Sequence, residues 1–419
     1  MDYFHYVNGE YHAEDVALKT IAEAVGTPFY CYSTATLERH YKVFSSHFEP
    51  QEAKVCYAVK TNSNVAVLAT LARLGCGADV VSEGEIRLAL RAGMRAQDIV
   101  FSGVGKTAQE MRYALEQDIF QFNVESEPEL QLLNHVAQQL GKRARIAIRV
   151  NPDVDPRTHA KISTGMKETK FGVAMSDAAR VYAKAATLPG IAVQGVSVHI
   201  GSQLTTLEPF VQAFARVRDF VLELRAKGHD INTLDLGGGL GIPYGQGEPP
   251  LPDAYAEVAK RETAGLNCLL IFEPGRVLTG NAGILVAEVI YVKHGENKRF
   301  LVVDAAMNDL IRPTLYDAYH EIVPVKQPVA GAVLSPMDVV GPVCETGDIF
   351  AEARKLPPLQ SGDLVAFRSC GAYCAVMASN YNTRRLVPEV LVNGARFSVV
   401  RERQSYDALI ERDTLPEWL

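Results

Sequence analysis

A lysine at the end of a predicted buried strand has the clearest chemical potential in this chain. Lys60 follows the apolar run Val55–Val59 and precedes the polar residues Thr61 and Asn62. A lysine amine partly shielded from water loses its proton more readily and can form a Schiff base with a carbonyl compound. A lysine at a strand end is more often simply solvated, so its role depends on the residues at the ends of the other strands.

Polar and glycine-rich residues come after several later predicted strands. They are His199 with Gly201 and Ser202, the run Gly237–Gly241, and Glu273 with Gly275 and Arg276. Glycines let backbone N–H groups approach a phosphate closely, and an arginine adds positive charge. The imidazole suits stacking on a planar ring, and the carboxylate suits a protonated ring nitrogen. Taken singly, each has an ordinary alternative: the glycine run is a tight turn, His199 is a core histidine, and Glu273 is a surface carboxylate. Together with the lysine they match the needs of pyridoxal 5'-phosphate.

The elements that position these residues alternate regularly. Predicted strands cover Val55–Val59, Ala78–Val81, Ile99–Phe101, Phe120–Val124, Arg145–Val150, Val193–His199, Thr233–Leu236 and Leu269–Phe272. Predicted helices cover Val65–Leu74, Glu83–Ala92, Lys106–Glu116, Glu127–Leu140, Ser176–Leu188, Pro209–Lys227 and Asp253–Ala264. Ser82 and Ser126, each with a glutamate three residues later, are typical helix starts. The fold class is therefore α/β, a parallel (β/α)8 TIM-like barrel, with an open doubly wound sheet as the alternative.

The pattern changes to strands linked by turns after about residue 280. Predicted strands are Ile284–Val292, Arg299–Val303, Val339–Val343, Leu364–Phe367 and Val387–Val392. They indicate a C-terminal antiparallel β-sandwich or barrel domain. The N-terminal piece Tyr3–Leu18 is hairpin-like, with Asn8-Gly9 as its turn, and we expect the β domain to take it up. The expected domains are 35–280 for the barrel, and 1–34 with 281–419 for a discontinuous β domain.

Composition narrows the class of protein. Charged residues make up 22% of the 419 residues and the net charge is -7, without a basic stripe, which argues against a nucleic-acid partner. No apolar run reaches membrane-spanning length, and we expect no signal peptide, hence a cytoplasmic protein without a membrane partner. Seven cysteines without paired spacing predict reduced thiols and no metal site.

The motifs resemble the fold type III, alanine-racemase-like pyridoxal-phosphate decarboxylases. The segments 57–62, 199–203, 237–241 and 273–276 carry this resemblance. It narrows to the diaminopimelate decarboxylase family through 312–320, 341–348 and 371–373, which lie in the predicted β domain. The likeness extends from about residue 26 to 381. Thr61 departs from it, because the family usually has alanine there.

The resemblance implies a role for each matching residue. Lys60 carries the cofactor, Glu273 keeps its pyridine nitrogen protonated, and His199 stacks on its ring. The implied phosphate ligands are Ser202, Gly238, Gly239, Gly275, Arg276 and Tyr373. The implied substrate is meso-2,6-diaminopimelate, with Arg276, Arg312, Tyr316, Glu345 and Tyr373 as its contacts. How Arg276 divides between phosphate and substrate is left open.

The cysteine of the segment 341–348 has its own implied role. Cys344 is the proton donor after CO2 departs, giving L-lysine in the last step of lysine biosynthesis. In the family its loop crosses a dimer interface, so the expected unit is a homodimer with shared active sites. Two alternatives stay open: a decarboxylase for ornithine, arginine or a carboxylated polyamine, and a non-catalytic relative that only binds a partner. The polar segment 158–170 is a candidate cover over the site.

Overall fold

The computed structural model describes residues 2–49, 53–155, 170–245 and 247–419. Most of the candidate cover, residues 158–169, lies outside these ranges. The chain divides into two compact units. We call residues 38–243 and 247–278 the barrel unit, and residues 1–37, 244–246 and 279–419 the β unit. Each unit is described by itself.

Eight parallel strands of the barrel unit form a closed ring. They are β5 (Ala53–Ala58), β6 (Gly77–Val80), β7 (Ile99–Phe101), β8 (Gln121–Val124), β9 (Ala144–Asn151), β11 (Ile191–Val198), β12 (Thr233–Asp235) and β13 (Leu269–Phe272). Parallel pairings of β13 with β5 and of β8 with β9 close the sheet on itself. The predicted barrel is thus confirmed and the open sheet is excluded. A short strand, β10 (Val173–Ala174), adds to β9 and was not predicted.

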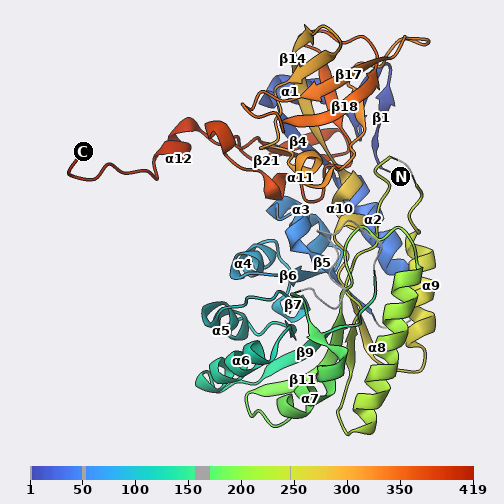
Figure 1. The fold of residues 1–419 in the computed structure, drawn as a ribbon, viewed down its shortest axis with the longest axis vertical. Helices are drawn as coiled ribbons and strands as arrows, with labels where there is room; N and C mark the ends of the chain where they lie inside the picture. The colour runs from blue at the N-terminus through green and yellow to red at the C-terminus, as the bar shows by residue number, and fades with distance from the viewer. Residues whose placement is uncertain (1, 50–52, 156–169, 246) are drawn as a thin grey trace. The chain divides into compact units, whose positions relative to one another are not determined.

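Helices follow the barrel strands and lie outside the ring (Figure 1). They are α3 (Val65–Ala72), α4 (Glu83–Arg91), α5 (Ala108–Glu116), α6 (Glu127–Gln139), α7 (Met175–Ala185), α8 (Glu208–Ala226) and α9 (Pro252–Thr263). The predicted caps are present, because Ser82 and Ser126 accept hydrogen bonds from the backbone N–H groups of Glu85 and Glu129. Such caps satisfy orphan N–H groups and begin each helix at a defined residue. The loop before each helix is thereby held at the mouth of the barrel.

Polar side chains, as well as apolar ones, fill the space inside the ring. Between the sheet and its helices the packing is aromatic and aliphatic, as in the stack of Phe48 on Phe272 at 4.0 Å between ring centroids. On the barrel strands, by contrast, Asp79, Asn123 and Asp235 are almost fully buried. Buried polar groups are costly unless they are hydrogen-bonded. Their presence in the barrel core therefore points to function.

The β unit holds two sheets. A three-stranded meander contains β1 (Phe4–Val7), β2 (Glu10–Ala13) and β3 (Val16–Ala17). The larger sheet contains β4 (Phe29–Ser33), β14 (Gly283–His294), β15 (Arg299–Val303), β16 (Ile322–Pro324), β17 (Ser335–Val340), β18 (Ile349–Leu356), β19 (Leu364–Phe367), β20 (Glu389–Asn393) and β21 (Arg396–Arg401). Most of its pairs are antiparallel, as predicted, but β15 with β17 and β4 with β20 are parallel.

The N-terminal strands differ in detail from the expectation. Asn8 and Gly9 form the predicted turn, both with positive φ (50° and 84°), which a type I′ hairpin turn requires. The hairpin does not become a strand pair of the larger sheet. It gains β3 and stays a separate sheet, with one isolated bridge from Glu10 to Lys326. The N-terminal strand that enters the larger sheet is β4, a fully buried run without the alternation that marks a half-exposed strand.

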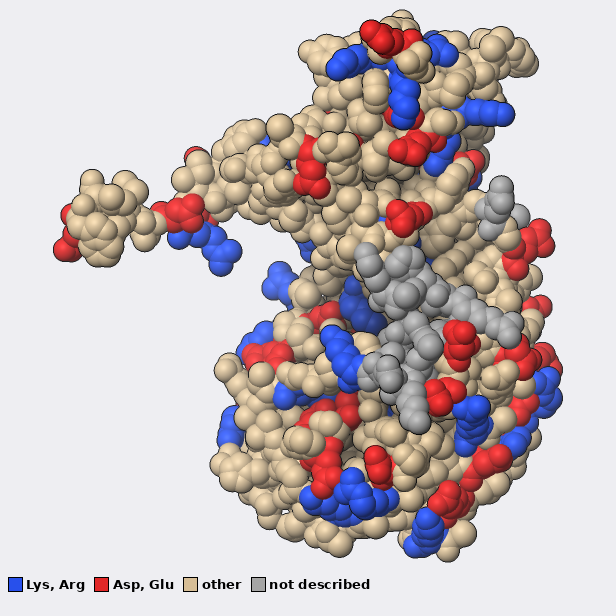
Figure 2. Space-filling view, viewed as in Figure 1, with Lys and Arg blue, Asp and Glu red and all other residues tan. Residues whose placement is uncertain are grey.

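The remaining elements are short, apart from one. The helices are α1 (Leu18–Val25), α2 (Thr34–Ser46), α10 (Arg276–Thr279), α11 (Arg312–Tyr316) and α12 (Tyr406–Ile410). Among the described residues, no helix has the length and apolar character needed to cross a membrane. On the face viewed in Figure 2, acidic and basic side chains are interspersed, without a continuous basic area. This agrees with the charge balance of the sequence.

Candidate active site

Lys60 lies where β5 ends, in the single 3-10 turn Val59–Thr61. Its Nζ donates a hydrogen bond of 2.7 Å to Oδ2 of Asp79, which is fully buried on the neighbouring strand β6. The other carboxylate oxygen of Asp79 is buried and has no hydrogen-bond partner among the described residues. A reactive amine is therefore held by one carboxylate at the carboxyl end of the barrel strands, the face where such barrels carry their chemistry.

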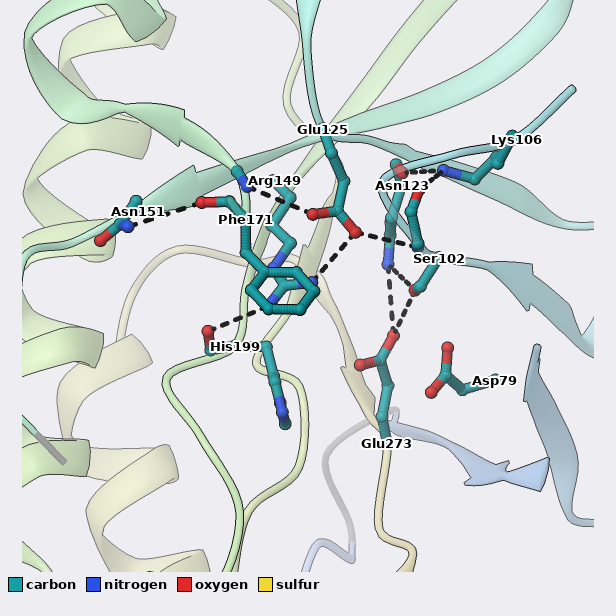
Figure 3. Close-up of polar contacts among 12 residues, drawn as sticks. Asp79, Ser102, Lys106, Asn123, Glu125, Arg149, Asn151, Phe171, His199 and Glu273 are labelled. Atoms are coloured by element: carbon teal, nitrogen blue, oxygen red, sulfur yellow. Dashed lines mark hydrogen bonds and ion pairs between the residues drawn. The ribbon is translucent and has the colours of Figure 1, made fainter. Parts of the chain in front are cut away.

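Glu273 follows β13 and is buried beside Asp79 (Figure 3). Its Oε1 accepts hydrogen bonds from Ser102 Oγ at 3.3 Å and from Asn123 Nδ2 at 3.2 Å. Burial, followed by the negative charges of Asp235 and Asp79, raises the pKa of Glu273 well above its usual range. The raised pKa favours the protonated carboxyl, which is the state that can hydrogen-bond to or protonate a ring nitrogen.

His199 comes directly after β11, and its ring has a defined tautomer. Nδ1 accepts a hydrogen bond of 3.1 Å from the backbone N–H of Gly238, so the ring proton sits on Nε2. Burial and then the cations Arg149 and Lys60 lower the pKa of His199 well below 6.5. The imidazole is therefore neutral and flat, which suits stacking on a planar ring better than acid catalysis.

A chain of buried ion pairs supports the backbone of His199. Arg149 Nη2 donates to the His199 carbonyl at 3.3 Å, and Arg149 Nη1 lies 3.0 Å from Glu125 Oε1. The backbone N–H of Glu125 in turn donates to Glu129, which pairs with buried Lys106 at 2.8 Å. Figure 3 shows Arg149 between Glu125 and His199. Each of these four charged groups has a partner, which offsets the free-energy cost of burying it. The network therefore holds the backbone of His199 in place.

Two glycines of the site approach other parts of the chain too closely for any larger residue. A Cβ on Gly238 would lie 2.2 Å from the Glu273 carbonyl oxygen, and one on Gly275 would lie 2.4 Å from Thr61 Cγ2. Thr61 therefore occupies the space that a side chain at position 275 would need. Beside Gly275, Arg276 Nη2 donates to Ser202 Oγ at 3.1 Å. Guanidinium, hydroxyl and glycine backbone offer the kinds of donor that suit an anion.

These residues fit pyridoxal phosphate. The amine, the carboxyl of raised pKa, the neutral imidazole and the donors that suit an anion all lie on the loops after barrel strands, and Lys60 influences the charge state of both His199 and Glu273. The cofactor needs these four kinds of group. The barrel unit thus brings together the predicted residues Lys60, His199, Ser202, Gly238, Gly239, Glu273, Gly275 and Arg276.

The other predicted residues lie in the β unit. Arg312 begins α11 and is buried, with Nη1 2.8 Å from His320 Nε2 and its guanidinium over the ring of Tyr244 at 4.6 Å. It is thus no surface ion pair, the ordinary alternative for a lone arginine. Tyr316 is the last residue of α11. A helix that holds a buried guanidinium next to a tyrosine suits carboxylate recognition.

The loop with Cys344 and Glu345 is tied to a second loop of the same unit. The backbone N–H of Cys344 donates to Asn382 Oδ1 at 2.9 Å, and Tyr381 donates to Glu345 Oε2 at 2.8 Å. Among the described cysteines, Cys344 alone is exposed. Tyr373 has φ of 57°, a left-handed conformation that large side chains rarely adopt outside functional sites.

Several polar residues of the barrel site were not predicted from the sequence, among them four that lie within strands. The four within strands are buried members of the polar network inside the barrel: Asp79, Asn123, Arg149 and Asp235. Each was part of a predicted strand, where a charged or amide residue among apolar neighbours is the signal that would have revealed it. Because strand residues alternate between the two faces, such a residue in a barrel strand points either to the core or to the helices.

Comparison with known proteins identifies the family. The family described as "Pyridoxal-dependent decarboxylase, pyridoxal binding domain" matches residues 34–280. Curated relatives named diaminopimelate decarboxylase are 51% identical in Zymomonas mobilis, over 99% of both chains, and 50% identical in Vibrio cholerae, over 100% of both. The chain belongs to the diaminopimelate decarboxylase family. Membership means that it is a pyridoxal-phosphate enzyme, a carboxy-lyase, which excludes the non-catalytic alternative.

Solved structures of this family share the whole architecture. The diaminopimelate decarboxylase from Helicobacter pylori, complexed with L-lysine, is 40% identical with a TM-score of 0.91, covering 94% of this chain and 98% of that one. The enzyme from M. jannaschii, also in complex with L-lysine, is 37% identical with a TM-score of 0.95, covering 100% and 99%. The arrangement of strands in this family therefore agrees with the predicted fold, and these two relatives bind an amino acid.

Proposed function

We propose that the chain decarboxylates meso-2,6-diaminopimelate to L-lysine and CO2, the last step of lysine biosynthesis. One structural observation carries the proposal: the amine of Lys60, the carboxyl of Glu273 and the neutral ring of His199 meet on one face of the barrel. Membership in the family supports the assignment of the substrate.

Each residue of the barrel site contributes one physical task. Pyridoxal phosphate, when bound, withdraws the electron pair that departing CO2 leaves behind. Lys60 supplies the amine that anchors the cofactor, and Asp79 orients that amine. Glu273 would hold a proton for the ring nitrogen, and His199 would stack on the ring. Ser202, Gly238, Gly239, Gly275, Arg276 and Tyr373 are the proposed phosphate ligands.

The substrate has two amino-acid ends, and the second must be recognised intact. A buried arginine offers paired N–H donors that match a carboxylate, which is the proposed task of Arg312, with Tyr316 as a further donor. Glu345 offers a carboxylate for the distal ammonium. Arg276 and Tyr373 complete the proposed substrate contacts. Substrates such as ornithine lack the second carboxylate, so they would leave Arg312 without its anion.

Proton return and assembly complete the proposal. Cys344 is the proposed donor to the carbon that loses CO2. We also propose that residues 35–280 bind the cofactor, and that residues 1–34 and 281–419 supply substrate and dimer contacts. The active unit is a homodimer in which each chain contributes Cys344 and Glu345 to its partner's site. A cytoplasmic location agrees with the free state of all seven cysteines.

The decisive experiment measures CO2 release from a panel of amino acids. We expect turnover of meso-diaminopimelate, stoichiometric formation of L-lysine, and little turnover of ornithine or arginine. Lys60→Ala should abolish turnover and the borohydride-sensitive absorbance of the bound cofactor, whereas Lys54→Ala, which changes a lysine of the preceding strand β5 that pairs with Asp98, should keep both. Turnover of ornithine or arginine without turnover of diaminopimelate would overturn the proposal.

A further inference from the structure

A buried carboxyl pair lies beneath the cofactor site. We infer that Asp235 is a positioning residue, which with Glu273 stores one proton inside the barrel for the ring nitrogen of the cofactor. This inference rests on the proposed function, because it takes Glu273 as the partner of that nitrogen. Nothing in the motifs of the family resemblance assigns a role to Asp235.

Two hydrogen bonds fix the carboxyl group of Asp235 at the end of β12. Oδ1 accepts from the backbone N–H of Gly237 at 2.9 Å, and Oδ2 accepts from Asn123 Nδ2 at 2.7 Å. The backbone N–H of Glu273 donates to the carbonyl of Gly237 at 2.7 Å. Asp235 therefore holds the first residue of the glycine turn, and that residue holds the backbone of Glu273. One buried side chain sets both the phosphate turn and the carboxyl group.

The donors around Asp235 and Glu273 supply too few hydrogen atoms for both carboxyl groups. Gln121 Nε2 donates to Asn123 Oδ1 at 2.8 Å, which orients the amide so that its NH2 group faces the carboxyl groups. That NH2 group has two hydrogens, yet it faces three acceptors: Asp235 Oδ2, Glu273 Oε1 and Ser102 Oγ. Asn123 Nδ2 is within hydrogen-bond distance of both carboxyl groups, so the two groups lie close together, and a proton held between them would make their contact favourable. With both groups ionised, this contact would be a repulsion.

The surrounding charges place that proton on Glu273. Burial raises the pKa of Asp235 to about 6, while the hydrogen bonds from Asn123 and from the backbone of Gly237 act in the opposite direction. On Glu273, burial and the charges of Asp235 and Asp79 act together to raise the pKa, and Lys60 opposes them. Burial, followed by the negative charge of Asp235, raises the pKa of the neighbouring buried group Tyr255, which stays neutral. The pair therefore holds a single negative charge and one proton at neutral pH.

The stored proton has a defined path. As the cofactor binds, the O–H bond of Glu273 breaks and an N–H bond forms on the ring nitrogen, so Glu273 becomes the carboxylate facing a cation. Atoms and charge balance without a proton from solvent. Asp235 stays ionised throughout and acts only through Glu273 and Gly237.

The test counts protons on cofactor binding. The full-length chain, stripped of cofactor, is titrated with pyridoxal phosphate at pH 8.5 in buffers of different ionisation enthalpy, and the proton uptake per site is compared between variants. Asp235→Asn removes the charge that raises the pKa of Glu273, so it should take up more protons per site than wild type, approaching one. Asp98→Asn, an aspartate of the same barrel that pairs with Lys54 and Arg95, should match wild type.

A second measurement keeps the inference testable if Asp235→Asn fails to fold. The infrared carbonyl stretch of a protonated carboxylic acid should be present in the cofactor-free wild-type chain at pH 8 and absent from Glu273→Gln. Absence of that band in wild type, or equal proton uptake by wild type and Asp235→Asn, would overturn the inference. Neither readout depends on turnover, so the inference can fail while diaminopimelate is still decarboxylated, and the reverse also holds.

Discussion

Lys60 Nζ and Asp79 Oδ2 lie 2.7 Å apart, and the aspartate is fully buried while the lysine side chain keeps 34% of its exposure. The two residues come from neighbouring parallel strands, because Asp79 pairs in register with Ala58, two residues before the lysine. A buried carboxylate next to an amine favours the ammonium form, which is not nucleophilic. The ion pair therefore positions Lys60 but also restrains it until the cofactor arrives.

Removing the charge of Asp79 should release that restraint. We expect Asp79→Asn, stripped of cofactor, to form the cofactor's Schiff-base absorbance on the order of tenfold faster than wild type at pH 7, with the difference shrinking only as the pH rises above the usual lysine pKa of about 10.4 and both amines lose their proton. Stopped-flow absorbance with pyridoxal phosphate measures this. The control is Asp98→Asn, which removes the charge from a different ion pair of the same barrel, that between Asp98 and Lys54. Slower attachment at pH 7 would show that orientation of the amine outweighs its charge state.

Arg312 should decide between diaminopimelate and substrates with one carboxylate. We expect Arg312→Ala to lower kcat/KM for diaminopimelate roughly 10- to 100-fold, the usual cost of losing a charged hydrogen bond. The matched control is Arg354→Ala, since Arg354 also lies over a tyrosine ring, at 4.2 Å, and donates to the His320 carbonyl. Steady-state kinetics and thermal unfolding separate lost recognition from lost packing. Equal losses in both variants would contradict a role in recognition.

Cys344 should affect turnover rather than binding. We expect Cys344→Ala to reduce kcat by about 10²- to 10⁴-fold with KM nearly unchanged, because a positioned proton donor acts on the chemical step. Serine has nearly the same size as cysteine, but its hydroxyl gives up a proton less readily than a thiol. Cys344→Ser should therefore also lower kcat. In heavy water, lysine formed by either variant should carry deuterium in mixed configuration at the reacting carbon. A variant with normal kcat would remove Cys344 from the mechanism.

His199 should make stability depend on pH in a defined direction. Its pKa lies well below 6.5 in the folded chain. Below about pH 6.5 the unfolded chain therefore binds a proton that the folded chain does not, and the stability contributed by His199 falls as pH drops. His199→Gln cannot titrate, so its loss of stability relative to wild type should shrink between pH 7.5 and pH 5. Urea unfolding of both proteins at the two pH values measures this. A constant difference would mean that His199 is not kept neutral by the fold.

The barrel was predictable because local rules and the global fold agree there. The strand Ile99–Phe101 and the strand Leu269–Phe272 have the predicted bounds, and the capped helices begin where Ser82 and Ser126 indicated. Apolar runs of this length, each followed by a helix with its own cap, allow few other topologies. In the β unit the same approach missed β16, β18 and β21, which are short or largely exposed and lack a continuous apolar run.

The residue types at the strand ends were enough to establish an amine, an imidazole, a carboxylate and a glycine turn, because parallel strands bring their carboxyl ends to one face. The sequence by itself thus determined which groups are present and their order around the ring. Only the tertiary structure decided their electrostatics: burial, with Asp235 and Asp79 close by, raises the pKa of Glu273, and burial, with Arg149 close by, lowers the pKa of His199. Electrostatic effects depend on distances between side chains and on the exclusion of water, and a linear sequence contains neither.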